Sequence, residues 1–156
     1  MARLVADKPG YRFVAWEDTA IVVWLEAPTV DATAQMYSFV TALAAERKAS
    51  IYILVFIESL ATMPDAQARK AMGESMAQTA SITKEVVGVI EGEGFRAAAV
   101  RAVASGMQLF ARKTAPMTSV ATAEAAIDLL LRRRGSSSVL ERAGLTNAVR
   151  LARTGA

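Results

Sequence analysis

The seven residues from Ile51 to Ile57 constrain the fold of this chain more than any other stretch. All seven are apolar, most are β-branched or aromatic, and the polar residues Glu58 and Ser59 follow them directly. A short, continuous apolar run of this kind predicts a strand that is buried on both faces. Such strands occur in parallel sheets that helices cover on both sides, so the expected fold class is α/β.

The other predicted elements complete a mixed, mostly parallel sheet of five strands with four helices. Besides the central run, strands are predicted at Tyr11–Trp16, Ala20–Leu25, Glu85–Ile90 and Met117–Val120. Helices are predicted from a cap at Thr29 or Asp31 to about residue 48, and at about 62–76, 95–113 and 122–134. The first two strands are expected to form an antiparallel hairpin, and right-handed crossovers through the helices make the later strands parallel.

The helix after the central strand is expected to begin with a capping box. In this prediction the Thr62 hydroxyl accepts a hydrogen bond from the Asp65 amide, and the Asp65 carboxylate reaches back. Pro64 then lies in the first helical turn, where its missing amide proton costs little.

The chain has no cysteine and no histidine. The absence of cysteine excludes disulfides, thiolate nucleophiles and cysteine metal sites, and the absence of histidine removes the commonest general base near neutral pH. We therefore expect no catalytic residue, metal site or cofactor, and carboxylate chemistry by Glu91 and Glu93 ranks last. No apolar run approaches the roughly 20 residues that cross a bilayer, and no signal-peptide core is present, so a cytoplasmic protein is expected.

Charge is distributed unevenly along the chain. Residues 1–93 carry 8 Lys and Arg against 12 Asp and Glu, whereas residues 94–156 carry 10 against 3. The arginine triplet at 132–134 is part of the basic third and is compatible with an anionic partner. We favour a solvated helix end, where arginine complements the helix dipole, and expect no nucleic-acid binding.

The C-terminal residues are predicted to form an extension outside the main domain. The domain is expected to span residues 1–134, and Gly135 with three serines resembles a linker. Residues 139–153 have a narrow apolar stripe at helical spacing, and two short helices broken near Gly144 are predicted. Such a stripe needs a partner surface, either this chain's own domain or a sister subunit.

Residues 11–134 resemble a known superfamily. The order of elements, the run from Ile53 to Met72, the segment EVVGVIEGEGFRAAAVRAV and the closing TAEAAIDLLL are similar to the STAS superfamily, in particular the divergent bacterial SpoIIAA-like group. This resemblance implies a regulatory, anti-sigma-factor antagonist type of interaction module with a phosphorylated serine at the helix start. Asp65 occupies the comparable place here, as a fixed negative charge or only a cap, and Ser59 or Thr62 remain alternative phosphoacceptors.

A non-enzymatic protein-interaction module is the first functional hypothesis. The loops that follow the central strand and the next parallel strand are expected at one edge of the sheet, where α/β proteins place binding sites. The partner-binding candidates at this edge are Glu58, Ser59, Thr62, Asp65, Glu91, Glu93 and Arg96. Its acidic character favours a protein partner with a basic surface, and a homodimer is a second option.

A small-ligand or lipid carrier is the alternative hypothesis, ranked behind the protein partner. It rests on soft side chains that are able to line an adaptable pocket, namely Met36, Met63, Met72, Met76, Met107 and Phe110. We favour an ordinary core role for these side chains. The two hypotheses predict different interiors, since a carrier needs an apolar cavity on the order of a few hundred Å³ that opens to solvent.

Overall fold

The protein is described from a computed structural model, in which residues 1–58, 61–92, 94, 97–98, 100–102, 105 and 114–156 are described. The strands are β1 (Arg3–Lys8), β2 (Tyr11–Trp16), β3 (Thr19–Trp24), β4 (Ile51–Ile57), β5 (Thr83–Val89) and β6 (Met117–Val120). The helices are α1 (Val30–Arg47), α2 (Ala66–Thr79), the short 3₁₀ helix η1 (Ala80–Ile82), α4 (Ala123–Arg134) and α5 (Val139–Thr154). Together they form the predicted α/β fold.

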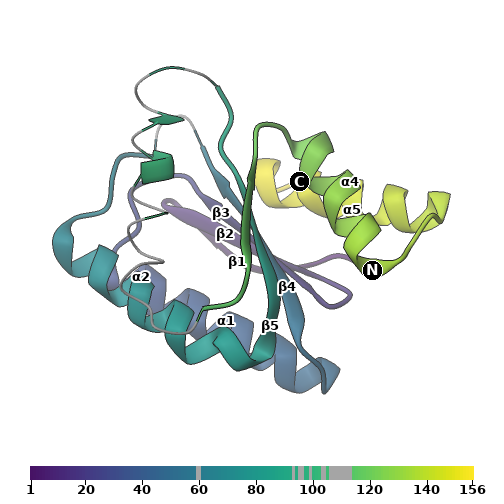
Figure 1. The fold of residues 1–156 in the computed structure, drawn as a ribbon, viewed down its shortest axis with the longest axis horizontal. Helices are drawn as coiled ribbons and strands as arrows, with labels where there is room; N and C mark the ends of the chain where they lie inside the picture. Colours follow the sequence, from purple (N-terminus) through teal and green to yellow (C-terminus); the bar gives the residue numbers. More distant parts are fainter. Residues whose placement is uncertain (59–60, 93, 95–96, 99, 103–104, 106–113) are drawn as a thin grey trace.

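The strands form one mixed sheet in the order β1-β2-β3-β4-β5-β6. The β1–β2 and β2–β3 pairs are antiparallel, and the three pairs from β3 to β6 are parallel. Helices α1 and α2 cover one face of the sheet, and α4 and α5 cover the other (Figure 1). The predicted hairpin and parallel crossovers are therefore confirmed.

Strand β4 lies in the middle of the sheet and contributes to both faces. Leu54 and Phe56 belong to the core under α4 and α5, whereas Ile51 and Ile53 belong to the core under α1. Ile51 and Leu54 are fully buried. Because alternate side chains of a strand point to opposite faces, this one apolar run packs against the helical layers on both sides of the sheet.

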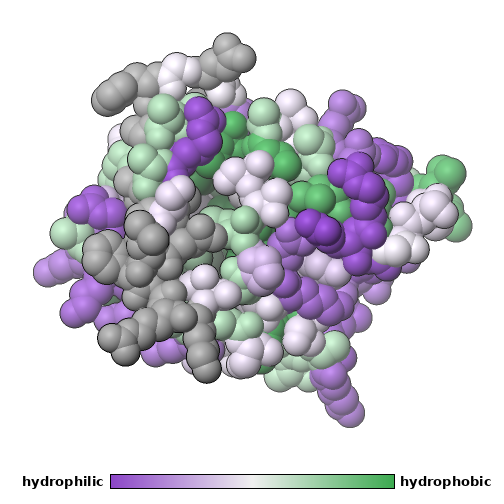
Figure 2. Space-filling model, viewed as in Figure 1, coloured by the Kyte–Doolittle hydropathy of each residue, from purple (hydrophilic) through white to green (hydrophobic). Residues whose placement is uncertain are grey.

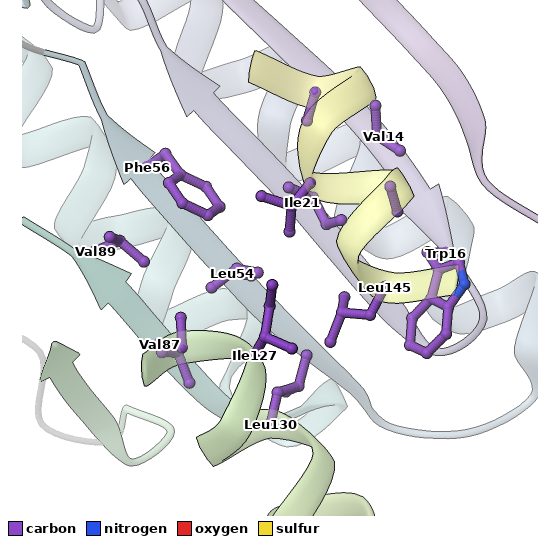
Figure 3. Close-up of a cluster of buried hydrophobic side chains, with 14 of the residues drawn as sticks. Val14, Trp16, Ile21, Leu54, Phe56, Val87, Val89, Ile127, Leu130 and Leu145 are labelled. Atoms are coloured by element: carbon purple, nitrogen blue, oxygen red, sulfur yellow. The ribbon is translucent and has the colours of Figure 1, made fainter. Parts of the chain in front are cut away.

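Among the described residues, more buried side chains belong to the core on the α4 and α5 face than to the core under α1. Figure 3 shows Ile127 and Leu130 of α4 and Leu145 of α5 gathered over side chains of the sheet, among them Leu54 and Val87. Leu130 and Leu145 are fully buried. The apolar stripe of the C-terminal residues is therefore covered by the protein's own sheet, one of the two surfaces expected for it.

Side-chain caps fix several helix boundaries. Thr29 accepts a hydrogen bond from the Ala32 amide at the start of α1, and Thr122 accepts one from Ala125 at the start of α4. At the end of α4, Gly135 adopts a left-handed conformation with φ of 68°, which glycine adopts without steric cost. The sequence predicted the start and the end of α4, and Thr29 is one of the two caps expected for α1.

Three sequence predictions are corrected by the structure. The capping box is wrong because Asp65 itself is the N-cap of α2 and accepts from the Ala68 amide at 2.8 Å, which leaves Pro64 outside the helix. The sheet gains the unpredicted edge strand β1, so it has six strands rather than five. The break near Gly144 is also wrong, since α5 is continuous. The helix predicted at 95–113 lies mostly outside the described residues.

Gly144 has a packing role that explains why the helix tolerates it. A Cβ atom built at this position would lie 3.0 Å from Nε1 of Trp16, which is 4% exposed. The missing side chain allows α5 to lie close against β2. Gly73 in α2 differs, because a Cβ atom there would have no neighbour within 4 Å in the described part of the chain.

We expect opposite effects from alanine at these two glycines. Gly73→Ala should raise the free energy of unfolding by about 0.5–1 kcal/mol, the usual gain from replacing a helical glycine. Gly144→Ala should lower it, because the new methyl group has to displace the Trp16 ring. Urea unfolding of the two variants measures both values, and a gain of equal size at both positions would contradict the close packing of α5.

Candidate functional site: an apolar pocket and an acidic rim

An apolar pocket of about 130 Å³ lies between the sheet and helices α1 and α2. Its walls come from α1, α2, the inner strands β4 and β5, the edge strand β6 and the segment before α2. The described lining residues are Trp24, Pro28, Met36, Tyr37, Val40, Ile53, Val55, Ile57, Thr62, Met63, Pro64, Met72, Ser75, Met76, Thr79, Thr83, Val86, Gly88, Ile90, Val100, Ala115, Met117 and Ser119.

The chemistry of this lining is uniform in one respect, since none of these side chains carries a charge. Of the five methionines named from the sequence as candidate pocket residues, Met36, Met63, Met72 and Met76 line one pocket together with Met117. The other candidates, Met107 and Phe110, lie outside the described residues. Unbranched thioether side chains adapt their shape to what they contact. The pocket is therefore suited to apolar molecules and tolerates some variation in their shape.

The volume limits what the pocket holds. It is smaller than the few hundred Å³ expected of a carrier, and close to the roughly 150 Å³ apolar cavity that accommodates benzene. Met63 is 38% exposed and Ser119 is also exposed, so the pocket communicates with solvent at its margin. A single small ring or a short hydrocarbon segment matches this size.

An acidic rim, defined here by Glu58 and Glu91, lies at the carboxyl ends of β4 and β5 as the sequence predicted. The structure also places a guanidinium group there, because Arg153 in the last turn of α5 binds both carboxylates. Its Nε and Nη2 donate to Glu58 at 2.7 and 3.1 Å, and its Nη1 and Nη2 donate to Glu91 at 2.9 and 2.8 Å. One guanidinium thus makes two forked pairs and neutralises half of the rim charge.

The surroundings of Arg153 hold it in this position. Its guanidinium carbon lies 5.3 Å from the centre of the Phe56 ring, and its backbone carbonyl accepts a hydrogen bond from Nη1 of Arg12 at 2.7 Å. Hydrogen bonds to Glu58 and Glu91 raise the pKa of Arg153 above its ordinary value. The side chain therefore remains charged, and α5 is joined to the ends of two strands and to the first hairpin.

The remaining partner-binding candidates have different positions. Asp65 caps α2, as the simpler of its two expected roles requires, and Thr62 lines the pocket. Ser59, Glu93 and Arg96 lie outside the described residues. The structure thus brings Glu58 and Glu91 together through Arg153 and places Thr62 in the neighbouring pocket instead.

Several arginines of the basic C-terminal third form ion pairs with carboxylates of the same chain. Arg133 donates to the buried carboxylate of Glu85 at 2.9 Å, and Arg134 pairs with Asp18 and covers the ring of Trp16. Figure 2 shows hydrophilic residues gathered on the side of the molecule where Figure 1 places α4 and α5. Two arginines of the triplet therefore serve as ion-pair partners.

In the described part of the chain, no cluster of three or more Asp, Glu, His or Cys residues has a geometry that holds a metal ion. No helix among the described residues is long and apolar enough to cross a membrane. No protein-family model matches the sequence, and no curated protein matches it either.

Sequence reasoning missed two features of the site. Arg153 was not among the predicted site residues, since nothing in the sequence pairs it with a residue 95 positions earlier. Ser75 and Thr79 were overlooked although they are four residues apart, as are Met72 and Met76, the spacing that places side chains on one helix face. That spacing was the available signal for a mixed apolar and hydroxyl lining.

Replacing Arg153 should destabilise the protein more than replacing its neighbour on α5. Arg153→Met keeps the apolar stem but removes the charged hydrogen bonds to Glu58 and Glu91, so we expect the free energy of unfolding to fall by about 1–3 kcal/mol. Arg150→Met is the matched control, because the Arg150 side chain is exposed and donates to the carbonyl of Ala156. Its effect should stay within about 0.5 kcal/mol. Urea unfolding measures both, and equal losses would show that the rim contacts contribute nothing.

Proposed function

We propose that this protein is a non-enzymatic domain that binds a small uncharged apolar molecule in the pocket between α1, α2 and the sheet. The observation that carries the proposal is the lining, in which no described side chain is charged and five are methionines. Binding in such a site is driven by the removal of apolar surface from water. The small volume favours a ligand of about the size of benzene, or one end of a longer chain.

The resemblance to the STAS superfamily is compatible with this proposal and remains a proposal itself. The observed order β2, β3, α1, β4, α2, β5, β6, α4 supports it, because the described elements follow the order on which the resemblance rests. A fold of this kind hosts many functions, so the pocket and not the fold carries the argument about the ligand.

Methionine methyl groups provide a direct test of ligand binding. In protein labelled with ¹³C at these methyls, toluene should shift the signals of Met72, Met76 and Met117, which line the pocket, because the ring enters among them. The signal of Met1, which is fully exposed, should not move. Single Met→Leu variants assign the signals. Absence of any saturable shift would overturn the proposal.

A blocking variant is the matched control for this experiment. Gly88 lines the pocket, and of the residues that the structure describes only Ser119, through its Oγ at 3.9 Å, would lie within 4 Å of a Cβ atom there. Gly88→Val should therefore occupy ligand space without a backbone clash and abolish the toluene shifts. Gly73→Ala, which changes a glycine outside the pocket, should leave them unchanged. Circular dichroism of both variants verifies that the fold is retained.

A protein-interaction module is the second candidate function, as the sequence first suggested. The observation that favours it is Arg153 itself, since the rim formed by Glu58 and Glu91 accepts a guanidinium through both carboxylates. We propose that an arginine of a basic partner protein binds the same rim in place of Arg153. The bidentate geometry suits arginine better than lysine.

Removing Arg153 should strengthen binding of a basic peptide if this second proposal holds. Arg153→Met removes the guanidinium that competes for the two rim carboxylates, so a short tri-arginine peptide should bind this variant about tenfold more tightly than the wild type, a difference of about 1.4 kcal/mol. Calorimetry at low ionic strength, where exposed charges are least screened, measures the affinities. Adding Glu58→Gln and Glu91→Gln to the variant should cancel the gain. Equal binding by all three proteins would exclude the rim.

A further inference from the structure

Three buried hydroxyl residues gather along one part of the pocket lining. Ser75 and Thr79 lie one helical turn apart on α2, and Thr83 begins β5. Their exposed fractions are 8%, 6% and 8%, respectively, and all three line the pocket. Thr62 and Ser119, the other lining residues with aliphatic hydroxyls, are exposed. The pocket lining thus has three buried hydroxyl residues on one part and two exposed hydroxyl residues at its open margin.

Two of the three buried hydroxyls are already used as donors. Thr79 Oγ1 donates to the carbonyl of Ser75 at 2.8 Å, and Thr83 Oγ1 donates to the carbonyl of Thr79 at 2.8 Å. Ser75 differs, because its hydroxyl makes no hydrogen bond within the described part of the chain. A hydroxyl in a mostly buried residue that has no partner among the described residues is unfavourable unless something else binds it. Buried groups of this kind are normally satisfied by a partner that enters from outside, such as water or a ligand.

We infer that the ligand is an uncharged apolar molecule with one oxygen atom, a carbonyl or a hydroxyl, which binds the Ser75 hydroxyl. This inference rests on the proposed pocket function and narrows its ligand class. The free Ser75 proton is available to the ligand oxygen, and Thr79 and Thr83 keep lone pairs that accept from a ligand hydroxyl. A carboxylate or ammonium group is disfavoured, since no described lining residue supplies a counter-charge.

The test compares ligands that differ in one oxygen. Cyclohexanone and methylcyclohexane have the same six-membered ring, and their dissociation constants follow from titrations of the methionine methyl signals. Ser75→Ala should weaken cyclohexanone binding roughly 3- to 10-fold, the effect of one neutral hydrogen bond, and leave methylcyclohexane binding unchanged. Cyclohexanecarboxylate, which is charged at neutral pH, should bind more weakly than either to the wild type.

Ser38→Ala is the matched control, because it removes an exposed hydroxyl from a helix without changing the pocket lining. It should change neither dissociation constant. If Ser75→Ala affects both neutral ligands equally, affects neither, or if cyclohexanecarboxylate binds as well as cyclohexanone, the inference about the oxygen is wrong while the pocket function stands. If neither neutral ligand shifts the methionine signals of the wild type, the proposed function itself fails.

Discussion

The burial of β4 on both faces is the constraint on which the rest of the structure depends. Leu54 and Phe56 face α4 and α5, and Ile51 and Ile53 face the layer of α1. A strand without a polar face is stable only where apolar cover is present on both sides. The two helical layers, the parallel neighbours β3 and β5 and the placement of loops at one sheet edge all follow from that requirement.

The elements that sequence predicted are those with strong local signals. The apolar run of β4 and the caps Thr29 and Thr122 each determine structure from within a few residues. Strand β1 was missed because it is an edge strand with a bulge, and most of its residues are exposed, so it has no apolar alternation to detect. The start of α2 was predicted three residues too early because Thr62 and Asp65 are both good caps, and only the three-dimensional structure distinguishes them.

The features that sequence could not supply depend on contacts between distant residues. The continuity of α5 at Gly144 is understood only once Trp16 is known to lie against it. The same applies to charge, since the acidic first part and the basic last part of the chain pair with each other. Arg153 binds Glu58 and Glu91, and Arg133 binds Glu85. The charge imbalance in the sequence suggests an anionic partner outside the chain. In these pairs, however, the anionic partners of the arginines are carboxylates of the same chain.

The pocket and the rim share one stretch of chain, which relates the two candidate functions. Glu58, where this stretch begins, is held by Arg153, and Thr62, Met63 and Pro64, a few residues later, line the pocket. A ligand influences the rim only if it binds two arrangements of this stretch with different affinity. Any such coupling is reciprocal, so an arginine at the rim would change ligand affinity by the same factor as the ligand changes arginine affinity.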